Sequence, residues 1–174
     1  MKHVKRILLV IFACMFLTGC GENTYEQGVA SLKDGKYEEA IEQFEQAIEK
    51  ETNIGDSWRG IGIADWELGQ YDAASEAFEK ALENGSEETG SICHLIGSCK
   101  MQTEEYEEAI RYYDLGITSK DSTPEMIQEM RFNMVVAYEK LKDWESARTK
   151  LAEYIADYPD DEQAQKESTF LETR

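Results

Sequence analysis

The side chains best suited to chemistry in this 174-residue chain are Cys93, His94 and Cys99. Apolar residues around them follow a helical pattern, and the six-residue separation of the two cysteines then places their Cα atoms about 9 Å apart. A disulfide needs less than about 7 Å, and no second cysteine pair follows at a zinc-site spacing. We therefore interpret both thiols as small apolar residues packed between helices. We predict no catalytic residue, no metal site and no dissociable cofactor.

A segment that ends at Cys20 has the layout of a secretory signal. It begins with three basic residues, continues with an apolar run over residues 7–17 and ends with the small pair Thr18-Gly19. Eleven apolar residues make about 16 Å of helix, which is short for about 30 Å of hydrocarbon. The layout predicts a signal over residues 1–19 that is removed. In the alternative, this segment is an ordinary cleaved signal or a short anchor, and Cys20 is incidental.

The sequence Leu17-Thr18-Gly19-Cys20 resembles the lipobox of bacterial lipoproteins, whose signal peptidase cuts before a cysteine that carries diacylglycerol. The resemblance implies a mature chain that begins with lipidated Cys20, with or without an additional N-acyl chain. It also implies a bacterial cell envelope location, on the outer face of the cytoplasmic membrane or on an outer membrane. Residues 20–23 would be the lipidated cysteine and a tether, whose three residues span about 10 Å. Partners are therefore expected near the membrane.

The mature chain would be strongly acidic. Residues 1–19 hold three of the 18 Lys and Arg residues and none of the 36 Asp and Glu residues. The remaining 155 residues therefore contain 15 basic and 36 acidic residues, a formal charge of −21. Nucleic-acid binding depends on basic side chains that neutralise phosphates, so this balance disfavours it. The acyl chains, rather than the folded body, are the expected membrane contact.

A pattern of small and aromatic residues recurs along the mature chain. Six residues recur at an offset of 34: Gly28, Gly35, Tyr37, Ala40, Phe44 and Ala47 match Gly62, Gly69, Tyr71, Ala74, Phe78 and Ala81. Two weaker copies follow. The third contains Gly97, Tyr106, Ala109, Tyr113 and Gly116, and the fourth contains Leu141, Trp144, Ala147 and Leu151. The apolar residues are three or four positions apart, which predicts one stripe of a helix. Gly35 and Gly69 suit turns between helices, whereas Gly28, Gly62 and Gly97 fall inside helices, where a close helix crossing would explain them.

This pattern resembles the tetratricopeptide repeat family, most closely in the second copy, which also has the leading Trp58. The resemblance implies an all-α fold, a right-handed α-solenoid of four helical hairpins with a C-terminal capping helix. The hairpins are expected over approximately residues 21–54, 55–88, 90–123 and 128–161, and the capping helix over residues 160–172. Residues 24–174 would form this domain.

In that family, the first helices of successive hairpins line a concave groove that binds peptides or short protein segments. The family register selects Tyr25, Val29, Leu32, Lys33, Arg59, Ile63, Trp66, Glu67, His94, Ser98, Met101, Phe132, Val136 and Glu139. Nine of them are expected to bind a partner, and we call these the groove residues: Tyr25, Val29, Leu32, Arg59, Ile63, Trp66, Met101, Phe132 and Val136. Family members that clamp a terminal carboxylate use several Lys, Arg and Asn side chains. Only Arg59 and Asn133 could serve here, so such a clamp is not expected.

Two functions follow from these expectations. The first is a lipid-anchored, extracytoplasmic scaffold that binds a peptide or an apolar segment of a partner protein in envelope assembly or secretion. The second is a non-catalytic subunit whose repeats build a homo-oligomer in a membrane-associated complex. The two differ in whether substitutions in the groove release a partner or disrupt self-association. In a further alternative, neighbouring repeats or the C-terminal helix cover the groove residues.

Overall fold

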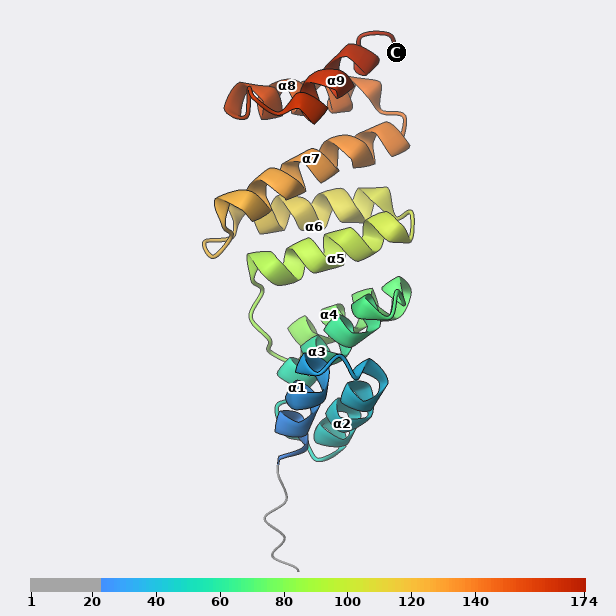
Figure 1. Ribbon diagram of the computed structural model, residues 1–174, viewed down its shortest axis with the longest axis vertical. Coiled ribbons are helices and arrows are strands. Elements are labelled where there is room, and N and C mark those ends of the chain that lie inside the picture. The colour runs from blue at the N-terminus through green and yellow to red at the C-terminus, as the bar shows by residue number, and fades with distance from the viewer. Residues whose placement is uncertain (1–22) are drawn as a thin grey trace, which may run out of the picture.

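The computed structural model describes residues 23–174, and every regular element in this part of the chain is a helix. The nine helices are α1 (Thr24–Lys33), α2 (Tyr37–Glu49), α3 (Ile54–Glu67), α4 (Tyr71–Glu83), α5 (Gly90–Gln102), α6 (Tyr106–Thr118), α7 (Pro124–Lys140), α8 (Trp144–Asp157) and α9 (Glu162–Leu171). They stack along the long axis of the molecule, with α1 near one end and α9 at the other (Figure 1). None of these helices is both long and apolar enough to span a membrane. The predicted signal and Cys20 lie outside the described residues.

Consecutive helices pair into hairpins, α1 with α2, α3 with α4, α5 with α6 and α7 with α8. This arrangement confirms the all-helical solenoid of hairpins that the sequence predicted. Asn23 caps α1, because its side chain accepts a hydrogen bond from the backbone N–H of Tyr25 at 3.2 Å. The first helix therefore starts at Thr24, with three residues between it and Cys20 in the sequence.

Each hairpin turn contains one residue in the left-handed conformation. Gly35 and Gly69, both with φ of +73°, fill this position in the first two hairpins, as their spacing predicted. Glu104 and Lys142 adopt it in the third and fourth, with φ of +63° and +60°. Neither residue type favours this conformation. The acidic pair Glu104-Glu105 lies in the turn that precedes α6, not on a helix surface.

A glycine of the first helix meets an aromatic ring of the second in three hairpins. A Cβ atom placed on Gly62 would lie only 2.7 Å from the ring of Phe78, which is closer than real side chains approach. Corresponding distances are 2.7 Å for Gly28 with Phe44 and 2.6 Å for Gly97 with Tyr113. Because these rings are buried, the missing side chains provide the space that the rings fill. The close crossings expected at these glycines are confirmed.

The fourth hairpin fills the same space differently. Val135 takes the place of the glycine and Leu151 takes the place of the aromatic residue, and both are buried in one apolar cluster. A larger residue on the first helix is thus matched by a smaller one on the second. At this crossing the two facing residues together fill a similar volume in all four hairpins, although the residues themselves differ.

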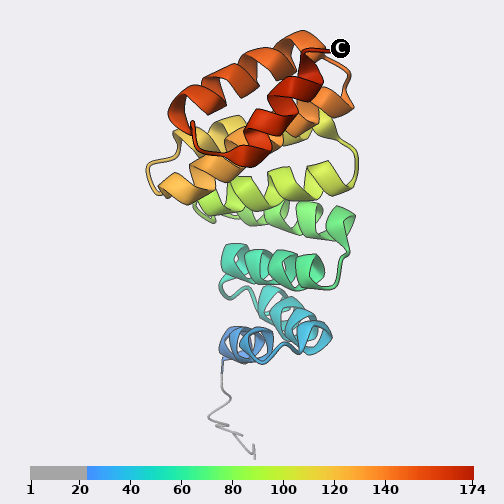
Figure 2. The same cartoon turned by 45° about the horizontal axis from the view of Figure 1, so that its top comes forward.

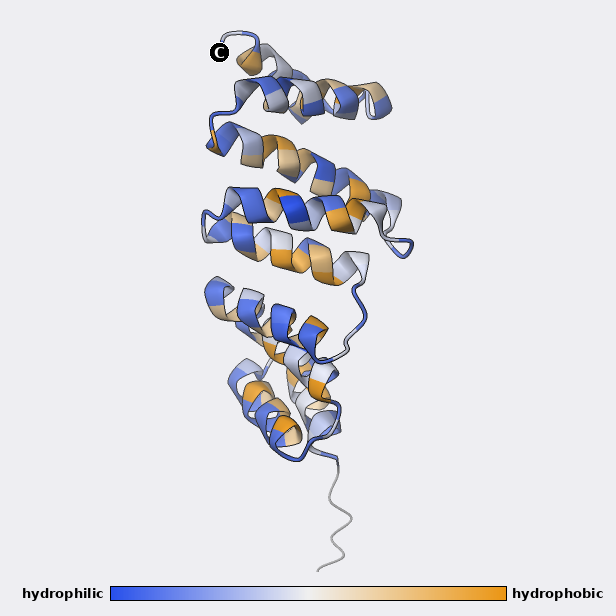
Figure 3. Ribbon diagram, turned by 180° about the vertical axis from the view of Figure 1, so that it is seen from behind, coloured by the Kyte–Doolittle hydropathy of each residue, from blue (hydrophilic) through white to orange (hydrophobic). Residues whose placement is uncertain are grey.

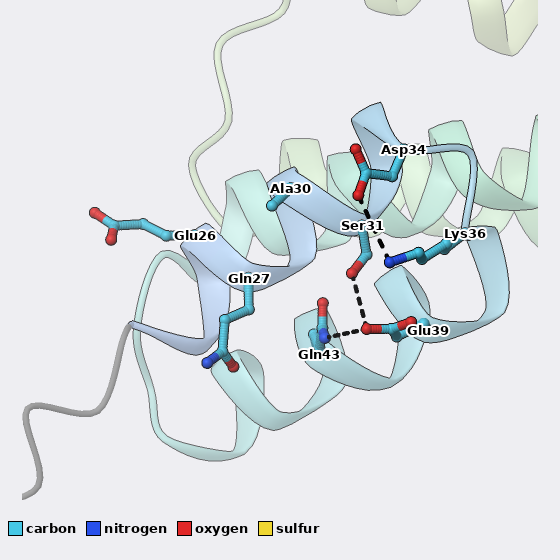
Figure 4. A pocket seen from close by; sticks show the side chains of 8 residues that line it. All are labelled: Glu26, Gln27, Ala30, Ser31, Asp34, Lys36, Glu39 and Gln43. Atoms are coloured by element: carbon cyan, nitrogen blue, oxygen red, sulfur yellow. Dashed lines mark hydrogen bonds and ion pairs between the residues drawn. The ribbon is translucent and has the colours of Figure 1, made fainter.

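The first helix presents a polar face at its end of the stack. Glu26, Gln27 and Ser31 stand 34 residues before the buried Gly60, Ile61 and Asp65 of α3. They line an open hollow of about 430 Å³ between α1 and α2, together with Ala30, Asp34, Lys36, Glu39 and Gln43 (Figure 4). A terminal repeat needs such a polar outer face because no further helix covers it.

The last helix closes the other end. Ala164 and Leu171 of α9 are buried in the apolar cluster that contains Leu151, and α9 lies over the end of the stack (Figure 2). It begins at Glu162, within the range expected for the capping helix, because the Asp161 carboxylate accepts the first free backbone N–H groups at 2.9 and 3.1 Å. Its exposed residues are mostly polar, among them Glu162, Gln165, Lys166 and Thr169, but they also include Phe170, which is 41% exposed.

Candidate partner-binding surface

All nine groove residues lie on the first helices α1, α3, α5 and α7, and every one of them is partly exposed. Helix α1 contacts α3, and α5 contacts α7, so the first helices lie side by side within the two N-terminal and the two C-terminal hairpins, whereas the second and third hairpins meet mainly through α4 and α5. The capping helix α9 packs on α8 at the end of the stack, away from α1, α3 and α5 (Figure 1). It therefore does not cover the surface of the first three hairpins.

The two N-terminal hairpins present a mainly apolar surface. Tyr25 packs against Phe44, with ring centroids 5.9 Å apart, and Val29 and Leu32 contact the same cluster. In the second hairpin Trp66 meets the ring of Tyr71 edge-on at 5.0 Å. Each of these partly exposed side chains has one side fixed against the core and another open to solvent, which is the arrangement of a binding anchor.

The two candidates for a carboxylate clamp both have partners within the fold. Arg59 forms an ion pair with Asp56 at 2.9 Å on α3. Asn133 hydrogen-bonds the hydroxyl of Tyr113, a contact that favours the ionised phenol, but burial dominates and raises the pKa of Tyr113 to about 12.

The third hairpin brings polar groups to the middle of the surface. The Nε2 atom of His94 lies 3.3 Å from Oε1 of Glu129 on α7, at an angle unsuited to a hydrogen bond. Ser98 and Tyr113 share a hydrogen bond of 3.3 Å between their hydroxyl oxygens. Met101, the groove residue of this hairpin, packs on the cluster that contains Tyr113. The surface is therefore less apolar here than in the first two hairpins.

Aromatic rings and carboxylates surround the groove residue Phe132 on α7. Its ring centroid is 5.4 Å from that of Tyr154, which is 4.8 Å from that of Tyr158, and we call these three residues the aromatic row. An open hollow of about 240 Å³ lies beside Phe132, and we call it the α7 hollow. Its lining residues are Glu125, Gln128, Glu129, Phe132, Asn133, Tyr154 and Asp161. Sequence reasoning missed this hollow, and Tyr154 at a position where the repeat usually has alanine was the available signal.

Glu139 occupies a groove position of the fourth hairpin and faces a carboxylate of α9. Burial, and then the neighbouring Glu167, raise the pKa of Glu139 to about 7, against a small opposing effect of Lys140. Its buried Oε1 atom has no hydrogen-bond partner. The contact between α7 and α9 therefore favours a protonated carboxyl at this position.

Cys93 and Cys99 occupy the apolar core, as the sequence predicted, and both thiols are free. Burial raises the pKa of Cys93 to about 11 and that of Cys99 to about 12. At neutral pH both are protonated thiols, which are poor nucleophiles. Within residues 23–174, no group of three or more His, Cys, Asp and Glu residues is placed to hold a metal ion.

Most of the acidic residues lie elsewhere than on this surface. Helix α2 alone contains five Glu residues and no Lys or Arg, and Figure 3 shows hydrophilic residues interspersed with hydrophobic ones along the helices seen from behind. Part of the negative charge is thus a solvated surface of the second helices.

Comparisons with known proteins identify the repeat. Tetratricopeptide repeat models match residues 25–89, 59–126 and 129–161. No curated protein sequence matches the chain. Among solved structures, YrrB, described as a TPR protein with an unusual peptide-binding site, is 19% identical with a TM-score of 0.72, and the match covers 85% of this chain and 74% of YrrB. MamA from Desulfovibrio magneticus RS-1 is 17% identical with a TM-score of 0.70, and the match covers 87% of this chain and 82% of that one. These structures share the fold, and together with the repeat models that span most of residues 25–161 they show that this chain belongs to the tetratricopeptide repeat family.

Proposed function

We propose that this protein is a lipid-anchored scaffold outside the cytoplasm that binds an apolar segment of a partner protein on its groove residues. The observation that carries the proposal is the set of partly exposed side chains on α1 and α3, which are fixed against the core on one side. Such side chains lose little conformational freedom on binding. The peptide-binding site in the description of YrrB supports a peptide as the class of ligand.

Replacement of groove residues should release the partner. For the double variant Trp66→Ala/Phe132→Ala, we expect loss of the proteins that co-purify with the membrane-anchored wild type after cross-linking in cells. Val136→Arg should have the same effect, because it adds a bulky charge at a partly exposed position. Ala152→Arg, at an exposed position of α8, is the matched control and should retain the partner.

Folding of each variant is checked by circular dichroism, since Trp66 and Phe132 also contact the core. An unchanged set of co-purifying proteins in folded variants would contradict the proposal. Recovery of the protein alone, with a smaller sedimentation coefficient for the groove variants, would instead support the homo-oligomer. The polar outer face of α1 disfavours one form of that alternative, the end-to-end stacking of copies through this helix.

Lipid attachment at Cys20 is the second part of the proposal, and the lipobox-like sequence supports it. We expect wild-type protein to fractionate with membranes and to incorporate a labelled fatty acid. Cys20→Ser should lose the label and the lipid-dependent attachment. Cys14→Ser, which changes the other cysteine of the same N-terminal region, should retain both. A labelled Cys20→Ser variant would show that the lipid is attached elsewhere.

With α1 starting at Thr24, the tether supports a location of the first hairpin close to the membrane. A scaffold held there suits partners that are membrane proteins or chains that emerge from the membrane. We therefore place its work in envelope assembly or secretion.

A further inference from the structure

The C-terminal part of the groove differs in charge from the N-terminal part. Three carboxylates line the α7 hollow, from Glu125, Glu129 and Asp161. An adjoining hollow of about 410 Å³ shares Gln128 and Asp161 with it and adds Asp157 and Asp160. No Lys or Arg side chain lines either hollow.

Two of the three carboxylates at the α7 hollow have lowered pKa values, and in the described part of the chain none of the three forms an ion pair with Lys or Arg. Hydrogen bonds from the Tyr154 hydroxyl and from backbone N–H groups hold the pKa of Asp161 below its usual range. Backbone and Thr123 hydrogen bonds do the same for Glu125. Among the described residues, neither carboxylate forms an ion pair with Lys or Arg, and Glu129 has only His94 nearby. The hollow therefore carries negative charge that the fold does not neutralise.

The aromatic row gives this negative surface a second feature that suits a cation. Aromatic faces attract Lys and Arg side chains, and more strongly when carboxylates lie alongside. The fold already contains one such arrangement at the edge of the region. The guanidinium of Arg131 is 2.6 Å from the Asp157 carboxylate and 5.7 Å from the ring centre of Tyr158. Phe132 is partly exposed and has no cation of this chain at a comparable place in the described residues, whereas the Tyr154 ring is buried against Phe132 and Tyr158.

We propose that the α7 hollow receives a Lys or Arg side chain of the bound partner segment. The inference rests on the proposed function, because Phe132 is both a groove residue and a wall of the hollow. The partner segment would then combine apolar residues, which contact the first two hairpins, with a basic residue that lies between Phe132 and the carboxylates of the hollow. Charge complementarity thus selects a cationic apolar peptide over an anionic one.

Peptide selection tests this inference even while the partner is unidentified. Random 12-residue peptides displayed on phage are selected on the full protein in detergent micelles. We expect the selected peptides to be enriched in both apolar residues and Lys or Arg. For a selected peptide, Glu125→Gln/Glu129→Gln should lower the affinity about tenfold, and added salt should reduce this difference. The control Glu42→Gln/Glu107→Gln removes the same charge from the second helices and should leave the affinity unchanged.

Each outcome separates the inference from the proposed function. Apolar peptides without enrichment in basic residues would overturn the inference and leave the proposed function standing. An equal loss of affinity in the control would also overturn it, because the effect would then come from the overall charge. Failure to select any peptide would count against the proposed function itself.

Discussion

Gly62→Val is expected to lower the free energy of unfolding by about 3 kcal/mol, the upper end for overpacking a core. The new side chain would occupy space that the ring of Phe78 fills, since even a Cβ atom would lie 2.7 Å from that ring. Both residues are at the centre of the second hairpin and neither can move into solvent. Urea unfolding followed by circular dichroism measures the loss.

Phe78→Leu should partly rescue Gly62→Val, because the pair then reproduces Val135 and Leu151 of the fourth hairpin. Alone, Phe78→Leu should cost about 1–2 kcal/mol through the cavity that it leaves. The double variant should be more stable than the sum of the single effects predicts, by at least about 1 kcal/mol. The distant pair Gly62→Val and Leu151→Ala is the control and should be additive. If the stability effects of Gly62→Val and Phe78→Leu simply added, the two side chains would not compete for the same space, and this explanation would be wrong.

The stability of the protein should fall as the pH rises from about 4.5 to about 7, and Glu139 should cause much of this change. Its pKa is raised in the folded state from 4.5 to about 7, so in this range the folded state binds more protons than the unfolded state. Linkage then requires the free energy of unfolding to decrease with pH. The full rise in the pKa of Glu139 would correspond to a change of about 3 kcal/mol in the free energy of unfolding. Solvent screening of this partly exposed carboxyl reduces the expected change to about 2 kcal/mol.

Glu139→Gln should therefore stabilise the protein at pH 8 by about 2 kcal/mol and change it little at pH 4.5. Urea unfolding across this pH range measures the effect, and hydrogen exchange should locate it in α9, where Glu167 faces Glu139. The exposed Glu107→Gln is the control for a general change in charge. A pH profile that is the same in Glu139→Gln and wild type would show that this carboxyl does not govern the contact.

Local patterns in the sequence predicted the helices and their pairing well. The glycines at positions 28, 62 and 97 indicated close crossings through their spacing alone, because inside a helix glycine is costly unless a neighbour needs its space. The N-cap at Asn23 was equally readable, since capping depends on a residue and its immediate neighbours.

Features that depend on packing between hairpins were less accessible to sequence reasoning. Glu104 and Lys142 stand at the repeat position of Gly35 and Gly69, but neither residue type favours the left-handed conformation that the turn imposes on them. The α7 hollow combines Glu125 with Asp161, residues from opposite ends of the α7–α8 hairpin that meet only when α8 folds back along α7. The register of α7 predicted Phe132 in the groove, but it held no information about the carboxylates that surround it.

The outer face of α1 is polar, and α9 caps the other end of the stack. The number of hairpins therefore sets the length of chain that can lie along the row of first helices. Packed helices are about 10 Å apart, and α3 and α5 are not among the closely contacting pairs, so the four first helices span at least roughly 30 Å. An extended peptide covers that distance with about nine residues. A partner would thus be recognised by a short linear segment, and a longer one would project beyond the stack at one end.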